Sequence, residues 1–208
     1  MRPGFISDLA DRLSRSLPGR NAHARMSPLP HRLDELPAED HTRASVMVLL
    51  MGDEQEMYFP LIKRNPVSAH DPHKGQVSLP GGRREESDYN MLFTALRETQ
   101  EEIGVPASEI KIVGALSELY IPVSNNLVYP YIGWYEGDLD FVLQESEVFD
   151  ILRCPVRHLI KEDLYTRRKL KTSYASSIEV PGFELEDAWV WGATAMILEE
   201  LRELIHTI

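Results

Sequence analysis

One predicted helix, residues 89–103, constrains this chain more than any other segment, because its two sides have opposite chemistry. Successive residues of an α-helix are turned by about 100°, which places Glu98, Glu101 and Glu102 on one arc. A second arc, about 140° away, carries the residues that can pack against a sheet: Leu92, Leu96, Thr99 and Ile103. The helix is therefore expected to lie on a sheet and to keep its three carboxylates on the other side.

Local signals also set the limits of this helix. Ser87 or Asp88 can cap its start, because a short polar side chain there accepts hydrogen bonds from the first free N–H groups. Gly104 suits the position just past the end, where left-handed backbone is common, and Pro106 prevents continuation. The preceding letters SLPGG predict a strand that ends in a permissive turn, which brings backbone close to the carboxylates.

The three glutamates are costly unless something neutralises them. Glu98 and Glu102 are like charges at i and i+4, a pairing that destabilises a helix by about 0.2–0.5 kcal/mol, and Glu101 adds another unfavourable neighbour. Negative charge near the end of a helix also opposes its dipole. A solvated acidic face is the plain alternative. Oxygen ligands that converge from one helix face suit Mg²⁺ or Mn²⁺, however, and either ion would cancel the repulsion.

The composition narrows the class of partner. A net charge of −11 argues against nucleic acid, since phosphate binding needs clustered Lys and Arg, and an acidic protein that handles phosphates needs a cation as intermediary. The single cysteine, Cys154, excludes an internal disulfide. Neither a signal peptide nor an apolar run of roughly 20 residues is found, so we expect a cytoplasmic protein with no membrane partner.

The rest of the chain predicts mixed α and β structure, in which helices cover a sheet. Strands are expected at 43–51, 57–64, 76–82, 110–119 and 127–135, with short strands within 169–174 and 180–191. Residues 65–75 have the composition of a loop, and residues 145–163 are mixed and include a short helix. An amphipathic helix at 192–205 closes the chain.

Residues 1–42 are expected to form a helix and an irregular arm ahead of a domain at 43–208. The helix, at 4–17, is predicted by apolar residues spaced four apart: Phe5, Leu9, Leu13 and Leu17. It can dock on the domain or on a second subunit, which would make a homodimer, whereas its mixed charges fit a membrane surface poorly. The four prolines of residues 18–42 predict an arm or linker without regular structure.

Some other residues could carry chemistry but have plainer interpretations. His70 and His73 form an H-x-x-H pair in a Pro-rich loop, which suits a loop over the substrate better than a zinc site. Cys154 has no histidine partner in sight and is interpreted as structural. Aromatic residues of the predicted strands could stack on an adenine, but such residues are more often core: Tyr120, Tyr129, Tyr131 and Trp134.

The stretch GGRREESDYNMLFTALRETQEEIGV, residues 81–105, resembles the signature of the Nudix hydrolases, G-x5-E-x7-R-E-U-x-E-E-x-G-U, where U is aliphatic. The second half of the signature matches in register at Arg97, Glu98, Glu101, Glu102, Gly104 and Val105. Two positions depart from it. Thr99 replaces an aliphatic residue, and Asp88 stands where a glutamate is usual, one residue further from the arginine.

The longer spacing is similar to that of a Nudix subgroup that resembles coenzyme A pyrophosphatases. The upstream letters GQVSLPGG, residues 75–82, fit that subgroup, and Arg64 ends the preceding strand. The intervening loop is longer than usual and lacks the arginine expected in its middle. Further segments that look like the subgroup are 120–133, 144–148 and 191–198, so the resemblance covers about residues 40 to 205.

The resemblance implies an α/β/α sandwich around a mixed sheet and metal-dependent hydrolysis of a nucleoside diphosphate linked to another group. Glu98 and Glu102 are the expected direct ligands of Mg²⁺ or Mn²⁺, with Glu101 as a ligand or a supporting partner. We expect Arg97 to orient a glutamate through a charge-assisted hydrogen bond; a surface ion pair is the alternative. Its place in the motif makes it a candidate catalytic residue.

Two further sets of residues complete the expected site. Gly81 and Gly82 would allow the backbone to approach metal or phosphate, although they also serve as plain turn residues, and Arg64 is expected to contact the substrate. The base that activates water is either Glu98 or a carboxylate from a later loop. Glu145 and Glu147 are the loop candidates, because the family commonly supplies such a group from a distant loop.

The subgroup resemblance predicts coenzyme A or a derivative as the small-molecule substrate, with 3′,5′-ADP and 4′-phosphopantetheine products. The nearest alternative is a Nudix hydrolase of ADP-ribose or another nucleotide sugar. An alternative of another class is a Nudix-fold module that binds a nucleotide without catalysis. The intact glutamates speak against that module, because binding alone does not need clustered repulsion.

Overall fold

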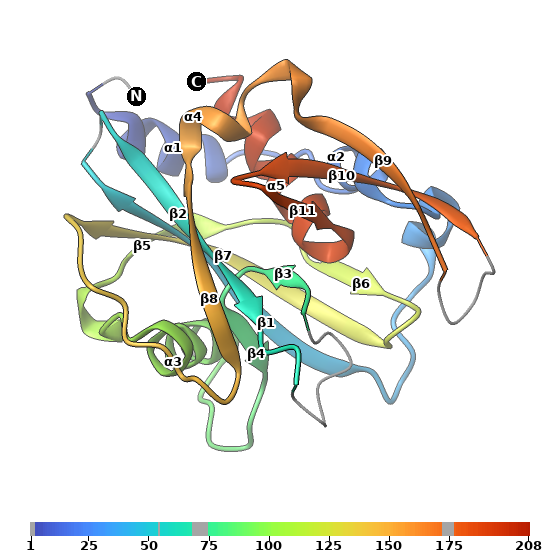
Figure 1. Ribbon diagram of the computed structural model, residues 1–208, viewed down its shortest axis with the longest axis horizontal. Helices are drawn as coiled ribbons and strands as arrows, with labels where there is room; N and C mark the ends of the chain where they lie inside the picture. Colours follow the sequence, from blue (N-terminus) through green and yellow to red (C-terminus); the bar gives the residue numbers. More distant parts are fainter. Residues whose placement is uncertain (1–2, 54, 68–74, 172–176) are drawn as a thin grey trace.

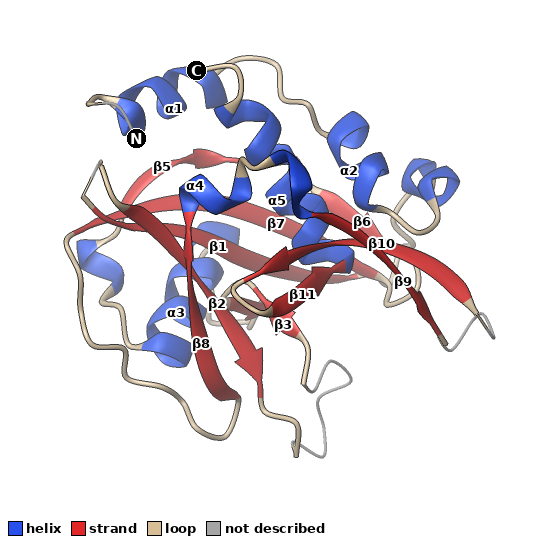
Figure 2. Cartoon of the chain, turned by 45° about the horizontal axis from the view of Figure 1, so that its top comes forward, coloured by secondary structure: helices blue, strands red, loops and turns tan. Residues whose placement is uncertain are grey.

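The computed structural model describes the 208-residue chain at residues 3–53, 55–67, 75–171 and 177–208. The loop histidines His70 and His73 therefore lie outside the described residues. The fold has three layers, with a large twisted sheet in the middle, one long helix against one face and further helices over the other (Figures 1 and 2). The predicted α/β/α sandwich around a mixed sheet is thus confirmed.

The elements follow one another in this order: α1 (Phe5–Leu13), α2 (Arg20–Met26), the short 3-10 helix η1 (Pro30–Asp34), β1 (Thr42–Gly52), β2 (Met57–Arg64), β3 (Val77–Ser78), β4 (Gly81–Arg83), α3 (Met91–Ile103), η2 (Ala107–Glu109), β5 (Lys111–Ala115), β6 (Leu119–Ile121), β7 (Asn126–Glu136), β8 (Val148–Pro155), α4 (Val156–Leu159), η3 (Glu162–Leu164), β9 (Tyr165–Leu170), β10 (Ile178–Leu185), β11 (Ala188–Trp191) and α5 (Gly192–Ile205). Among the described helices, none is long and apolar enough to cross a bilayer.

Within the described residues, eight strands form the large sheet around a central parallel pair. β1 and β7 run parallel over their whole length, from Thr42 opposite Asn126 to Gly52 opposite Glu136. The remaining pairings are antiparallel, with β2 and β4 on β1, β3 and β8 on β2, and β5 and β6 on β7. A smaller sheet of β9, β10 and β11 lies beside α5 (Figure 2).

Strand β1 separates two hydrophobic cores, because alternate side chains of a strand point to opposite faces. Val48 and Leu50 belong to the core under α5, the N-terminal helices and the small sheet. The other side chains join the core under α3, where they are fully buried: Met47, Leu49 and Met51. This two-sided burial explains why 43–51 reads as an almost continuous apolar run.

Helix α3 begins and ends close to the predicted limits, but its cap is a different residue. Asn90 is the N-cap, since its side chain accepts a hydrogen bond from the backbone N–H of Phe93. The prediction of Ser87 or Asp88 was wrong, because Asp88 turns inward to pair with Arg97 instead. Gly104 ends the helix in left-handed backbone, as predicted.

The buried face of α3 is also shifted from the predicted arc. Thr94 and Ala95 are fully buried alongside Thr99 and Ile103, whereas the predicted leucines are only partly buried. The shift brings Glu102 into the buried set as well. One of the three carboxylates therefore lies inside the protein rather than on a wet surface.

The N-terminal segment is more regular than its sequence predicts. Residues 18–42 were expected to be irregular, yet they contain α2 and η1. Helix α2 has only seven residues, so packing rather than local propensity holds it, and Ala22, His23 and Met26 are buried where it meets α5. Helix α1 packs on β5 and α5 of its own chain, which removes the reason to invoke a second subunit for it.

Two predicted strands are divided in the structure. The 76–82 strand breaks at Pro80, which has no N–H to donate but accepts a hydrogen bond from Met47 N through its carbonyl. The 110–119 strand breaks at Ser117, whose N–H and hydroxyl both bind the Glu200 carboxylate instead of a neighbouring strand. In the mixed segment 145–163 the short helix is present as α4, but strand β8 was not anticipated.

Candidate active site

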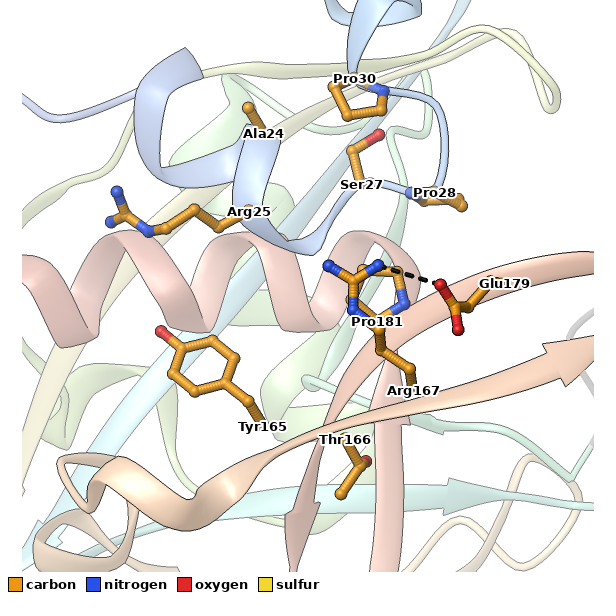
Figure 3. A pocket seen from close by; sticks show the side chains of 10 residues that line it. All are labelled: Ala24, Arg25, Ser27, Pro28, Pro30, Tyr165, Thr166, Arg167, Glu179 and Pro181. Atoms are coloured by element: carbon orange, nitrogen blue, oxygen red, sulfur yellow. Dashed lines mark hydrogen bonds and ion pairs between the residues drawn. The ribbon is translucent and has the colours of Figure 1, made fainter.

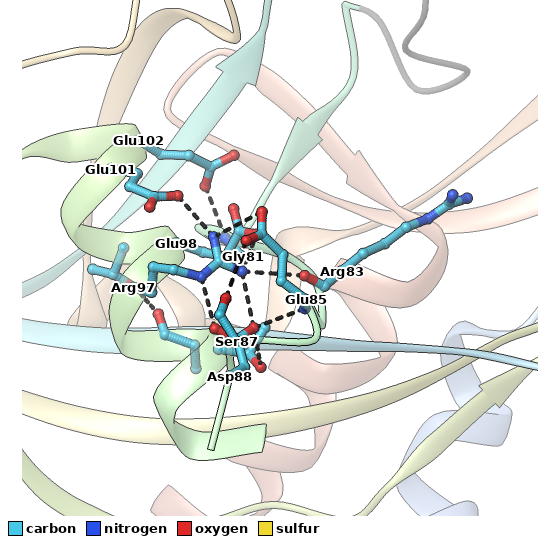
Figure 4. Close-up of polar contacts among 12 residues, drawn as sticks. Gly81, Arg83, Glu85, Ser87, Asp88, Arg97, Glu98, Glu101 and Glu102 are labelled. Atoms are coloured by element: carbon cyan, nitrogen blue, oxygen red, sulfur yellow. Dashed lines mark hydrogen bonds and ion pairs between the residues drawn. The ribbon is translucent and has the colours of Figure 1, made fainter. Parts of the chain in front are cut away.

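Arg97 is the centre of a polar cluster beside α3 (Figure 4). Its Nε and Nη2 atoms donate to the two carboxylate oxygens of Asp88 at 2.9 and 3.0 Å. The remaining donors reach Glu101 at 2.8 Å and Glu98 at 3.0 Å. One guanidinium thus fixes the positions of three carboxylates, which is the planar two-pronged binding that arginine performs and lysine cannot.

Asp88 is the buried anchor of this cluster. Besides Arg97, its carboxylate accepts hydrogen bonds from the backbone N–H of Glu85 and the hydroxyl of Thr94, both at 2.9 Å. The hydrogen bonds from Arg97 lower the Asp88 pKa to about 2, so this carboxylate remains charged at all ordinary pH values. Asp88 therefore has a defined structural task in the position where the signature has a glutamate.

Glu102 is the buried acid of α3 itself, with 1% of its surface exposed. One oxygen accepts a hydrogen bond from the backbone N–H of Gly81 at 2.8 Å, and the other lies 3.4 Å from Nη1 of Arg64. The Glu102 pKa is nevertheless raised to about 8, mainly by burial and to a smaller extent by the negative charges of Glu98 and Glu147. The hydrogen bond from Gly81 and the contact with Arg64 therefore do not fully neutralise the Glu102 carboxylate.

Glu98 lies against the backbone of Gly82, the residue that follows Gly81 in β4. A Cβ atom on Gly82 would lie 2.5 Å from the Glu98 carboxylate carbon, so glycine here allows Glu98 to hold its present position. Burial raises the Glu98 pKa, in part against the effect of Arg97, and Glu101 and Glu147 add to the increase. The glycine pair thus brings backbone into contact with both carboxylates.

Glu145 and Glu147 lie on the loop between β7 and β8, and they differ in their effect on the cluster. The charge of Glu147 acts on both Glu98 and Glu102, whereas Glu145 is not among the groups that raise their pKa values. The backbone of Glu147 is held by Asn65, which donates its N–H to the Glu147 carbonyl at 2.8 Å. Glu147 is therefore the better candidate of the two loop carboxylates for a role beside this cluster.

The donors present suit a hard divalent cation. Glu98 and Glu102 are one helical turn apart, supply only oxygen atoms, and are both short of neutralising charge. Glu101 points to Arg97 and is mostly exposed, so it fits a supporting position better than a ligand position. Within the described residues no three His, Cys, Asp or Glu side chains converge as a ready-made ligand set. Water and substrate oxygens would then complete the shell, as is usual for Mg²⁺.

A cavity of about 720 Å³ lies away from α3, between α2 and the strands β9 and β10 (Figure 3). Its charged residues are already paired, with Arg167 donating to Glu179 at 3.2 Å and Arg25 to Glu199 at 2.6 Å. Its lining residues include none of the α3 carboxylates. We therefore place the chemistry at α3.

The other candidates keep their plainer interpretations. Cys154 is buried, and burial raises its thiol pKa to about 12, so it is a poor nucleophile. Trp134 is buried in the core. Two contributions escaped sequence reasoning: the buried Asp88–Arg97 pair and the contact of Arg64 with Glu102. The extra residue between Asp88 and Arg97 was visible but did not reveal the pairing.

Comparison with known proteins agrees with this geometry. The NUDIX domain profile matches residues 41–174, which is more than half of the chain. The chain therefore belongs to the Nudix family. A Yersinia enterocolitica protein named uncharacterized Nudix hydrolase NudL is 30% identical over 141 residues, 64% of this chain and 68% of that protein. A Yersinia pestis protein of the same name is 28% identical over 134 residues, 64% of this chain and 66% of its own length.

Solved structures support the fold. A Nudix hydrolase from M. smegmatis, RenU, superposes with a TM-score of 0.54 at 16% identity, covering 81% of this chain and 88% of that one. A MutT/nudix family protein from Enterococcus faecalis gives 0.50 at 19% identity, covering 89% and 70%. The domain and the relatives named as Nudix hydrolases indicate a pyrophosphohydrolase. The chain is thus an enzyme, which sets aside the non-catalytic module.

Proposed function

We propose that this enzyme hydrolyses the diphosphate link of coenzyme A or its derivatives with Mg²⁺ or Mn²⁺, giving 3′,5′-ADP and 4′-phosphopantetheine products. The observation that carries the proposal is the placement of two under-neutralised carboxylates, Glu98 and Glu102, against the backbone of Gly81 and Gly82. A diphosphate is itself anionic, so these carboxylates repel it. A cation between the diphosphate and the carboxylates removes that repulsion.

Glu98 and Glu102 are the proposed direct ligands, and Glu101 supports them through Arg97. When bound, a divalent cation supplies charge neutralisation and lowers the pKa of a water molecule. Nudix hydrolases generally use divalent cations, which fits this donor set. The choice between Mg²⁺ and Mn²⁺ belongs to the proposal, since both accept hard oxygen ligands.

The protein's own residues perform three tasks in the proposed reaction. Glu147 takes a proton from the attacking water, whose oxygen bonds to phosphorus as the bridging P–O bond breaks; Glu98 is the alternative base. Arg97 holds Glu98 in place from one side, while Gly82 leaves the space that Glu98 needs. These contacts fix the carboxylates before substrate arrives, so little reorganisation is needed during the reaction.

Arg64 is the proposed substrate contact at the edge of the site. Its guanidinium lies 3.4 Å from the Glu102 carboxylate, and the side chain is one-fifth exposed. A guanidinium in this place can bind a phosphate oxygen of the substrate through charge-assisted hydrogen bonds. Coenzyme A in particular rests on the likeness of residues 75–82 to the coenzyme A subgroup and on the place of Arg64 just before that segment.

The experiment that tests the proposed function is a comparison of substrates on purified protein with Mg²⁺ or Mn²⁺. We expect coenzyme A to be hydrolysed with a higher kcat/KM than ADP-ribose, and the products to be 3′,5′-ADP and 4′-phosphopantetheine. Preferential turnover of ADP-ribose would refute the choice of substrate while leaving the site intact. We assign the activity to the 43–208 domain and place it in the cytoplasm, on the ground that Cys154 remains a free thiol.

A further inference from the structure

A second cavity, of about 580 Å³, is lined by the loop that bonds to the last turn of α3, and it differs in chemistry from the carboxylates of that helix. We name it the apolar pocket, and its lining residues are Phe141, Val142, Leu143, Glu145, Val148 and Phe149. Five of the six are hydrophobic. They come from the loop that runs past α3 after β7 and from the start of β8 (Figure 1).

The exposure of this pocket is unusual for apolar side chains. Val142 is 70% exposed and Phe149 is 67% exposed, although valine and phenylalanine are most often buried. Val148 is buried below them, and Phe141 and Leu143 pack on the core under α3. An apolar wall with a fixed floor is typical of a place that binds an apolar group.

Backbone hydrogen bonds connect the loop that lines the apolar pocket to helix α3. Gln144 donates its N–H to the carbonyl of Glu102 at 3.1 Å, and Val142 donates to the carbonyl of Ile103 at 3.2 Å. On the other side, Val148 is the strand partner of Arg64, whose guanidinium contacts the Glu102 carboxylate. The segments that line the pocket are therefore connected on one side to the last turn of α3, which carries Glu102, and on the other to Arg64.

The charge of the pocket selects which half of a substrate it can take. Its one charged lining residue is Glu145, and neighbouring Glu147 is also acidic. These two carboxylates disfavour a phosphate group inside the pocket, so the 3′-phosphoadenosine half suits it less well. The other half of coenzyme A carries a neutral, branched segment next to the diphosphate: the pantoyl unit with its geminal dimethyl group.

We propose that the apolar pocket binds the pantoyl segment of coenzyme A and so selects coenzyme A over nucleotide sugars, whose corresponding segment is a polar ring. This inference rests on the proposed function, because it names the substrate half that the same site would hold. Removal of a wall residue should weaken binding of that half alone, by about tenfold, the effect of losing a small apolar contact.

The test uses Phe149→Ser and Val142→Ser in the full chain, with Leu36→Ser as the matched control. Leu36 is an exposed apolar residue outside the pocket, so it reports the general effect of removing surface hydrophobicity. Calorimetry with Mg²⁺ measures binding of 4′-phosphopantetheine and of 3′,5′-ADP to each variant, and coenzyme A turnover is measured in parallel. We expect weaker 4′-phosphopantetheine binding in the two pocket variants and unchanged 3′,5′-ADP binding.

Other outcomes overturn the inference in recognisable ways. If coenzyme A is hydrolysed but the pocket variants weaken neither half, both halves equally or only 3′,5′-ADP, the pocket has another role while the proposed function stands. If the wild type neither hydrolyses coenzyme A nor binds 4′-phosphopantetheine, the proposed function itself has failed. If Phe149→Ser converts a wild-type dimer into a monomer without affecting 4′-phosphopantetheine, a second copy of the chain covers this surface.

Discussion

The backbone N–H of Gly81 donates a hydrogen bond to the buried carboxylate of Glu102, with 2.8 Å between nitrogen and oxygen. Gly81 belongs to β4, which pairs with β1 at the centre of the sheet, and Glu102 belongs to the last turn of α3. The bond therefore fixes the helix to the sheet at the point where we propose that metal binds. It also links the stability of the fold to the charge of one side chain.

That link predicts a pH dependence for the metal-free protein. The Glu102 pKa is about 8 in the folded state against 4.5 for an ordinary glutamate, so the folded state holds this proton more tightly. Stability from this group is complete below pH 4.5 and is lost as the pH rises to 8. We predict that Glu102→Gln is more stable than wild type above pH 8 in chelator, by about 5 kcal/mol.

Chemical denaturation at pH 6 and pH 9 checks this prediction. The difference should be smaller at pH 6, about 2 kcal/mol, because Glu102 is protonated in the folded wild type at that pH but ionised in the unfolded chain. Added Mn²⁺ should narrow the difference at pH 9, since it stabilises the protein that binds it. A Glu102→Gln variant that is less stable than metal-free wild type at pH 9 would contradict the raised pKa.

Two glycine variants separate the fold from the chemistry. In Gly82→Ala the new Cβ meets the end of the Glu98 side chain, which can move, so we expect normal stability and a fall of about 10²-fold in kcat. In Gly81→Ala the Cβ meets the backbone oxygen of Ser45, and φ is +148°, so we expect a loss of stability. Thermal unfolding and steady-state kinetics of both variants test the contrast, which fails if Gly82→Ala retains full activity.

The Arg97–Asp88 ion pair predicts that the single variant Arg97→Gln is less stable than the double variant that also carries Asp88→Asn. Arg97→Gln leaves the buried Asp88 carboxylate without its main partner, and breaking a buried pair costs about 3–5 kcal/mol. Adding Asp88→Asn removes the stranded charge, so the double variant should recover part of that stability. Activity should remain low in both, because Glu98 loses its hydrogen bond from Arg97.

Urea unfolding across pH tests the same pair. The Asp88 pKa is lowered to about 2 in the folded state from 3.8, so its contribution of about 2 kcal/mol is present above pH 3.8 and lost as the pH falls to 2. This acid-sensitive step should be absent from Asp88→Asn. Single and double variants of equal stability would show that the two side chains do not interact as described.

The proposed base can be identified by comparing the two loop glutamates. We predict that Glu147→Gln lowers kcat by about 10²–10³-fold, because Glu147 acts on the charges of both Glu98 and Glu102. Glu145→Gln should have at least a tenfold smaller effect on kcat. Equal effects of the two variants would favour Glu98 as the base.

The sequence predicted the layers and the acidic helix but not the finer contacts. The periodicity of 89–103 was enough to place Glu98, Glu101 and Glu102 on one side of a helix. Burial of Glu102 was hidden, because it depends on how far β4 approaches the last turn of α3. Periodicity gives the direction of a side chain, whereas its burial depends on the neighbouring element.

The N-terminal segment shows the same limit. Helix α2 is short, has no side-chain cap and lies in a segment rich in proline, so nothing local predicts it. It exists because Glu200 of α5 accepts hydrogen bonds from Gly19 and His23 and so holds the segment in place. Such pairing joins residues that are more than 170 positions apart, which a single sequence does not reveal.

Titration of Mn²⁺ into wild type, Glu98→Gln and Glu102→Gln, followed by electron paramagnetic resonance with coenzyme A turnover recorded on the same samples, tests the proposed metal site most directly. We predict that wild type binds Mn²⁺ and releases 3′,5′-ADP only when the ion is present. Both variants should bind it at least tenfold more weakly, with kcat lower by 10²-fold or more. Undiminished turnover in chelator, or wild-type Mn²⁺ binding by both variants, would contradict a metal site at these carboxylates.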